Sequence, residues 1–80
     1  MVNWEEKAFI ESSRNRKAIL KILKGGPLVV TELARKLSNH RSTVSQQLLE
    51  LEKHGFVECL TPKRKNYRIY GLTKKGTEVS

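Results

Sequence analysis

The fold is decided by the stretch "TELARKLSNHRSTVSQQLLELEKHGFVECL", Thr31 to Leu60. Within it, two segments with apolar residues at helical spacing are separated by the polar residues Ser38 to His40. The first segment predicts a helix of about two turns with Thr31 as its N-cap, and the second predicts a helix from Arg41 to Lys53. Gly55 stands where a helix-ending glycine is expected. Two short helices joined by a tight turn predict a helix-turn-helix.

The second helix of this pair has one apolar face and one polar face. Its apolar face consists of Val44, Leu48 and Leu51, which we expect to pack in the core against the first helix. The opposite face carries small hydroxyl and amide side chains with a cation just ahead of them: Arg41, Ser42, Thr43, Ser45 and Gln46. Because Ser, Thr and Gln side chains can bond base edges, and a helix N-terminus can receive a phosphate, these residues are candidates for DNA contact.

After this helix the apolar spacing changes from helical to alternating. Phe56–Leu60 and Tyr67–Leu72 each predict a strand, and Thr61–Asn66 predicts the turn between them. Tyr67 and Tyr70 are expected on opposite faces of the second strand, one of them in the core. The turn carries three consecutive cations, Lys63, Arg64 and Lys65. The pattern therefore indicates an antiparallel hairpin with a positive tip.

The segment before the helix-turn-helix contains further helical structure. Asn3 and Glu6 have the spacing of a capping box, so a helix is expected to begin at Trp4. Its apolar pattern is interrupted by the polar run "ESSRNRK" and resumes from Ala18 to Leu23, ending at two glycines and a proline. Either one long helix or two successive helices fit this pattern. Leu28–Val30 then form a short run of β type.

The chain is strongly basic, and its charge is unevenly distributed. Its 80 residues include 16 Lys and Arg against eight acids, giving a net charge of +8 and a pI of about 10.0. Between Cys59 and Thr77 there is no acid, but there are Lys63, Arg64, Lys65, Arg68, Lys74 and Lys75. A one-signed end on a small domain favours a polyanion-binding surface over a surface that merely aids solubility. The length predicts a single domain.

In order and in sequence, these elements resemble the winged helix-turn-helix proteins, and most closely the small prokaryotic regulators of the ArsR and MarR type. The matching segments are "RKAILKILKGGPLVVTELARKL", "STVSQQLLELEKHGFVE" and "YRIYGLTKKG". The resemblance implies an α+β fold of three helices plus a small antiparallel β-hairpin wing. It also implies a transcription factor bound to duplex DNA, with Arg41 to Gln47 in the major groove and the cationic turn at the wing. The residues expected to contact DNA are Arg41, Ser42, Thr43, Ser45, Gln46, Gln47, Lys63, Arg64, Lys65 and Arg68.

The resemblance also bears on metal sensing and on assembly. ArsR-type metal sensors carry cysteines on the recognition helix, and this helix has none, so metal sensing of that kind is not expected. Both families tend to dimerise through helices that flank the winged core. We therefore expect residues 1–14 to form an N-terminal helical extension and residues 15–80 the DNA-binding domain. A homodimer is expected through Trp4, Ala8 and Phe9, although Trp4 and Phe9 would fit the domain core equally well.

Catalysis, a metal site and a cofactor are not expected. The chain has no Asp, and no spacing of Ser or Cys with His indicates a nucleophile–base pair. His54 and Cys59 match no strong pattern of metal ligands. Cys59 is expected to be a structural residue rather than a redox switch, and a single cysteine fits the reducing cytoplasm. No apolar run is long enough to cross a membrane.

The sequence therefore predicts a sequence-specific regulator that binds double-stranded DNA in the cytoplasm, in association with the nucleoid. A winged-helix module that binds protein or RNA is the main alternative, because a fold does not determine a function. Leu49, an apolar residue far from the core direction of its helix, is the feature that favours this alternative. A non-specific chromosome-associated protein is a further alternative that is equally consistent with the charge.

Overall fold

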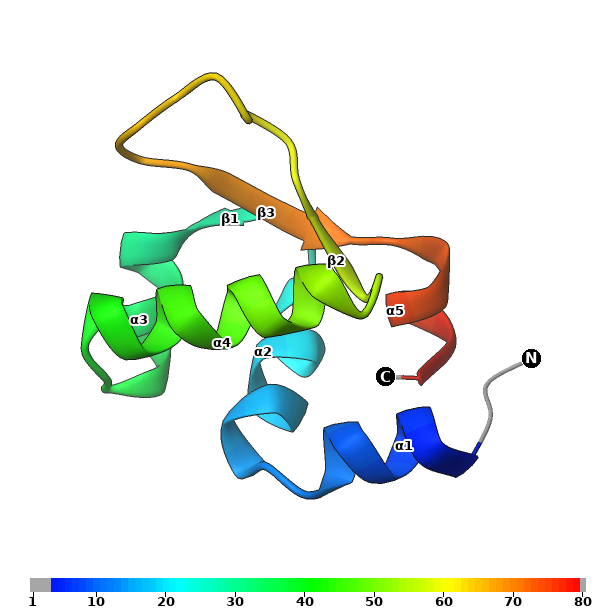
Figure 1. Cartoon of the computed structure of the whole chain (residues 1–80). Helices are drawn as coiled ribbons and strands as arrows, with labels where there is room; N and C mark the ends of the chain where they lie inside the picture. The colour runs from blue at the N-terminus through cyan, green and yellow to red at the C-terminus, as the bar shows by residue number, and fades with distance from the viewer. Residues whose placement is uncertain (1–3, 80) are drawn as a thin grey trace.

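In the computed structural model, which describes residues 4–79, the chain forms five helices and a three-stranded antiparallel sheet (Figure 1). The elements are α1 (Trp4–Glu11), α2 (Arg14–Leu23), β1 (Leu28–Val29), α3 (Val30–Leu37), α4 (Arg41–Lys53), β2 (Val57–Cys59), β3 (Ile69–Leu72) and α5 (Lys74–Val79). The predicted α+β winged helix-turn-helix is confirmed. Helices α1 and α5 and strand β1 are additional to the three predicted helices, α2 to α4, and to the hairpin formed by β2 and β3.

The polar run that interrupts the N-terminal apolar pattern contains the boundary between two helices. Helix α1 ends at Glu11, and Ser13 is the N-cap of α2, where its hydroxyl oxygen accepts a hydrogen bond from the Arg16 N–H at 3.3 Å. Of the two arrangements that fit the sequence, the structure therefore has two successive helices. Asn3, the expected N-cap of α1, lies outside the described residues.

Helices α3 and α4 form the helix-turn-helix, and α4 has the predicted bounds. Helix α3 begins at Val30 with Val29 as its N-cap, so the prediction that Thr31 caps it is wrong. The reason is that β1 leads directly into α3, and the Val30 N–H donates to the Arg68 carbonyl oxygen at 3.2 Å. This bond satisfies one of the free N–H groups in the first turn of α3, and no side chain forms a cap bond there. At its other end, α3 is closed by Ser38, which has a left-handed φ of 53°.

The sheet has the order β1-β3-β2, with β3 in the middle. On one side of β3, Cys59 of β2 lies opposite Tyr70, and on the other side Leu28 of β1 lies opposite the same tyrosine. Because β1 continues into α3 and β2 follows α4, the sheet joins the base of the hairpin to both helices of the helix-turn-helix.

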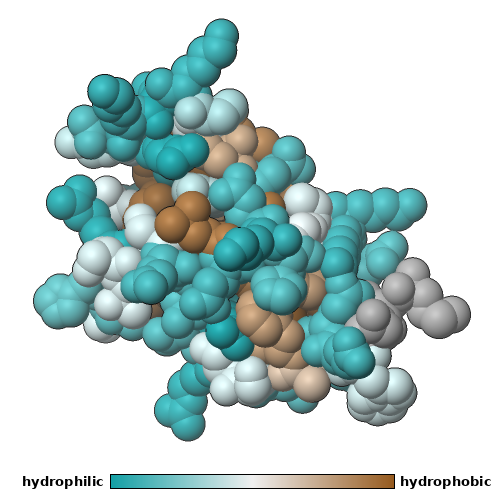
Figure 2. Space-filling view, viewed as in Figure 1, coloured by the Kyte–Doolittle hydropathy of each residue, from teal (hydrophilic) through white to brown (hydrophobic). Residues whose placement is uncertain are grey.

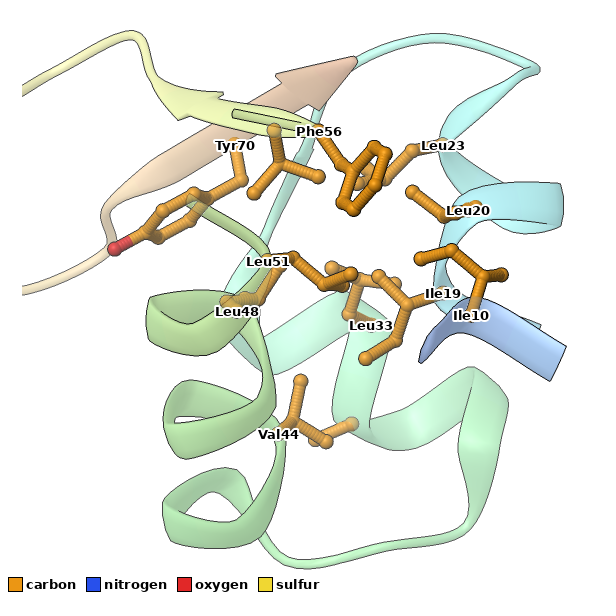
Figure 3. Close-up of a cluster of buried hydrophobic side chains, with 12 residues drawn as sticks. Ile10, Ile19, Leu20, Leu23, Leu33, Val44, Leu48, Leu51, Phe56 and Tyr70 are labelled. Carbon is orange, nitrogen blue, oxygen red and sulfur yellow. The ribbon is translucent and has the colours of Figure 1, made fainter. Parts of the chain in front are cut away.

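One core lies between the helices and the sheet, and α4 contributes one complete face to it. The buried apolar side chains of the described residues are Ile10, Ile19, Leu20, Leu23, Leu33, Ala34, Val44, Leu48, Leu51, Phe56, Val57 and Tyr70 (Figure 3). The expectation that Val44, Leu48 and Leu51 face the core is confirmed. With this face buried, the opposite face of α4 is left for another molecule.

Two further sets of contacts hold α4 in place. The Arg16 guanidinium donates to the Glu50 carboxylate of α4 at 2.6 Å and to the Phe9 carbonyl oxygen at 3.0 Å, so it joins α1, α2 and α4. At the end of α4, the Lys75 ammonium of α5 donates to the His54 carbonyl oxygen at 2.8 Å and forms an ion pair with Glu6 of α1. The first and last helices therefore enclose the C-terminal end of α4.

Candidate nucleic-acid interface

The outward face of α4 carries the polar side chains that the sequence assigned to it. Arg41, Ser42 and Gln46 are exposed, whereas Thr43 and Ser45 are half-buried at the edges of this face. Gln47, which was also expected to contact DNA, is half-buried, and its Oε1 atom is shielded from solvent with no hydrogen-bond partner among residues 4–79. Of the two adjacent glutamines, Gln46 is therefore the one that presents its amide to solvent.

The chain between β2 and β3 forms the wing, and Lys63, Arg64 and Lys65 are all exposed on it. At its base, the Leu60 N–H donates to the Ile69 carbonyl oxygen at 2.8 Å, and the Ile69 N–H donates to Thr61 Oγ1 at 3.0 Å. Figure 1 shows this loop extending past the end of the paired strands, on the side of the sheet away from α1. The wing therefore presents three cations at the end of a hydrogen-bonded base.

A groove of about 360 Å³ separates the wing from the N-terminal half of α4. Five of the residues expected to contact DNA line it: Arg41, Ser42, Ser45, Lys65 and Arg68. Its apolar lining comes from Val30, Leu49 and Tyr70, and Figure 2 shows hydrophobic surface in this hollow with hydrophilic side chains around it. The fold thus brings the two predicted halves of the site, helix and wing, to opposite sides of one groove.

Two groups in this groove have shifted pKa values. A hydrogen bond from the Arg68 guanidinium to the Cys59 side chain raises the pKa of Arg68. Burial raises the pKa of Tyr70 above the ordinary value of a tyrosine phenol. Arg68 is therefore cationic and Tyr70 neutral at physiological pH, so the groove keeps its positive charge there.

The aromatic residues of α1 have different surroundings. Trp4 is 84% exposed and Ala8 is also exposed. Phe9 is half-buried; its ring centroid lies 4.1 Å from that of His54, and the Arg16 guanidinium lies 3.9 Å from it. Phe9 therefore packs against the core of its own chain, which is one of the two interpretations that the sequence left open. Trp4 and Ala8 remain on the outside of α1.

A second, larger groove of about 610 Å³ lies among α1, α2 and the end of α5. Its apolar lining consists of Ile10, Ala18, Leu20 and Val79. Its charged lining consists of Glu11 and four cations at helical spacing, three of them on α2 and the last at its C-cap: Arg14, Lys17, Lys21 and Lys24. This groove combines an apolar floor with a positive rim, and it is formed by helices other than α3 and α4.

Sequence reasoning missed part of the lining of the first groove. Thr31, Leu49, Asn66 and Tyr67 all border it. Helical spacing already places Leu49 away from the core, but in the sequence alone that position favours protein binding and does not identify Leu49 as part of the DNA-contacting row of Ser42 and Gln46. Of the two tyrosines expected on opposite faces of one strand, Tyr70 is the one in the core, but Tyr67 lies before β3 and not in it, with a left-handed φ of 54° that no side-chain pattern signals.

Residues 12–59 match the model of a family described as helix-turn-helix domains. The chain is similar to the quinone-bound YodB from B. subtilis, with 30% identity and a TM-score of 0.76 over 99% of this chain and 84% of that one. It is also similar to HlyU from Vibrio cholerae, with 27% identity and a TM-score of 0.74 over 98% and 87% of the two chains.

A structure described as an ArsR family transcriptional regulator shares the fold at 22% identity, with a TM-score of 0.74 over 99% of this chain and 84% of that one. No curated protein sequence gives a significant match. Within residues 4–79, no helix is both long and apolar enough to cross a membrane.

Proposed function

The chain belongs to the helix-turn-helix domain family, and on that basis we propose that it is a transcriptional regulator that binds double-stranded DNA sequence-specifically. DNA binding and regulation agree with the family and with the similar structures. Specificity is supported by one observation above all: the outward face of α4 exposes Ser42 and Gln46 beside a cationic groove. The protein would act in the cytoplasm, where it would associate with the nucleoid.

Helix α4 is proposed to enter the major groove while the wing contacts the phosphate backbone. One α-helix fits the major groove, and Gln can form two hydrogen bonds with adenine there. Lys63, Arg64 and Lys65 are exposed and project from a hydrogen-bonded base, so they are suited to phosphates, which carry no sequence information. Arg41 and Arg68 line opposite sides of the groove that separates α4 from the wing. They would contact the DNA strand that crosses this groove.

Replacing Gln46 should relax sequence preference, whereas replacing the wing cations should weaken all duplexes alike. We expect Gln46→Ala to remove about 1–3 kcal/mol of discrimination between the preferred duplex and a single mismatch. The Lys63→Ala, Arg64→Ala, Lys65→Ala triple variant should keep that discrimination. The measurement is selection of duplexes from a random pool with the wild type, followed by competition binding with each variant.

Gln47→Ala is the matched comparison for this experiment. It makes the same chemical change one residue along α4, where the Oε1 atom is shielded from solvent, and it should alter the preference less than Gln46→Ala does. A wing variant that lost specificity while Gln46→Ala kept it would reverse the two roles. A pool that yielded no preferred sequence would instead support non-specific coating of DNA.

We also propose that the regulator is a homodimer in which the outward face of α1 of one copy meets the groove among α1, α2 and α5 of the other. The face carries Trp4 and Ala8, both exposed, together with the acid Glu5. The groove has an apolar floor and four cations on its rim, from α2 and its C-cap, so the surfaces match in both hydrophobicity and charge. A two-fold dimer would present two recognition helices to paired half-sites.

Trp4→Ala should weaken this dimer at least tenfold and leave the domain folded. Tryptophans at the centre of an interface commonly contribute about 2 kcal/mol or more, and Trp4 makes little contact with its own core because it is 84% exposed. Analytical sedimentation at about 10–50 micromolar protein, a range that detects micromolar dimer dissociation constants, measures this weakening. Tyr67→Ala, which removes another exposed aromatic ring far along the chain, should not alter the oligomeric state. A monomeric wild type under these conditions would refute the dimer.

A further inference from the structure

We propose that Leu49 contacts the C5-methyl group of a thymine and is a specificity-determining residue of α4. The inference rests on the proposed entry of α4 into the major groove. It gives a role in DNA recognition to the residue that, in the sequence alone, favoured a protein-binding function.

Leu49 is exposed, whereas the other leucines of α4 are buried. Its side chain is 54% exposed, whereas Leu48 and Leu51 of the same helix are completely buried. Leu49 is therefore not needed to fill the core. A large apolar side chain held in water gains free energy when it contacts another apolar group, so this position favours a ligand with an apolar feature.

The position of Leu49 on α4 places it among the proposed base-contacting residues. Ser42, Gln46, Leu49 and Lys53 are separated by four, three and four residues, so they form one outward row along the helix. Leu49 borders the groove toward the wing together with Ser42 and Ser45, and it also borders the hollow on the other side of α4 together with Gln46. It therefore stands on the ridge of the helix between these two hollows.

The chemistry of the major groove identifies the partner. Base edges present hydrogen-bond donors and acceptors there, and thymine adds a methyl group that the other three bases lack. A leucine offers no hydrogen bond but can cover that methyl group. On the wing side, Arg41, Lys65 and Arg68 line the groove, which favours a negatively charged partner such as a duplex. The hollow on the other side of Leu49 is also bordered by Glu50 and Glu52, and Glu50 is paired with Arg16.

The test compares thymine with deoxyuridine, which differs only by the missing methyl group. The duplex selected from a random pool is prepared with each thymine of a half-site replaced by deoxyuridine in turn. At one position we expect the wild type to bind about three- to tenfold more weakly, a change on the scale of one or two buried carbon groups. Leu49→Ala should bind the thymine duplex more weakly by a similar factor and should be insensitive to deoxyuridine at that same position.

Leu60→Ala is the matched control, because Leu60 is also an exposed leucine, 47% exposed, but follows β2 rather than lying on α4. It should keep the sensitivity to deoxyuridine. Equal loss of both duplexes in Leu49→Ala, no loss in either, or a selected site without thymine would each overturn the assignment. If Gln46→Ala still relaxes specificity in those cases, α4 remains the recognition helix and only the contact of Leu49 is refuted.

Discussion

Raising the salt concentration from about 50 to about 200 mM should weaken duplex binding by about a thousandfold. The proposed interface carries five cations, Arg41, Lys63, Arg64, Lys65 and Arg68. With the N-terminus of α4 they provide about six phosphate contacts, and each contact releases condensed counterions, so the log–log slope of affinity against salt should be near −5. Measuring the dissociation constant of one duplex over a salt series gives this slope directly.

The wing triple variant supplies an internal standard for that experiment. Each phosphate contact contributes about 0.9 to the slope, so removing the cations of Lys63, Arg64 and Lys65 should reduce its magnitude by about 2.7. Replacing Lys7, Lys36 and Lys74 together with Ala changes the net charge of the chain by the same amount at positions outside the wing and α4. A slope near zero in the wild type, or equal slopes in the two triple variants, would contradict the electrostatic role of the wing.

The second large effect concerns stability: Ile10→Ala should lower the free energy of unfolding by about 2–5 kcal/mol. Ile10 is only 4% exposed and belongs to the same core as Leu20 and Phe56 (Figure 3). Its truncation leaves a cavity in a small domain, for which total stability is typically about 5–15 kcal/mol. Chemical denaturation followed by far-UV circular dichroism measures the loss.

Helix α1 provides its own control for this stability experiment. Trp4→Ala truncates a larger side chain of the same helix, but that side chain is 84% exposed, so the unfolding free energy at low protein concentration should change by about 0.5 kcal/mol or less. Deletion of residues 1–10 removes Ile10 and should destabilise the whole domain. A deletion variant with unchanged stability would show instead that α1 is the separable extension expected from the sequence.

The helix-turn-helix could be predicted from sequence because its signals are local. Val44, Leu48 and Leu51 repeat at helical spacing, and Gly55 marks the end of α4 with a positive φ of 83°. The start of α3 could not be predicted, because it depends on the Val30 N–H finding the Arg68 carbonyl oxygen. That hydrogen bond joins residues far apart in the chain, so no local sequence pattern predicts it.

In the candidate site, too, some features could be predicted from local sequence patterns and others depend on contacts between distant residues. Ser42 and Gln46 could be predicted to be exposed because they lie opposite the core face of α4. The wing cations could be predicted to be exposed because they lie in a turn. The difference between Gln46 and Gln47 depends on how the flank of α4 packs, and it emerges only when neighbouring elements are in place. The half-buried state of Phe9 likewise depends on His54 and Arg16, which come from other helices.

The pairing of β3 with β1 has a consequence for the kind of duplex that the protein accepts. Leu28 and Val29 pair with the strand that carries the wing, and the next residue begins α3. Because α3 packs against α4, the wing and α4 are parts of one frame whose separation is set before any duplex binds. A duplex whose groove width or curvature does not fit the distance between the wing and α4 must deform in order to bind. The free energy of that deformation depends on the base sequence, even at positions that no side chain touches.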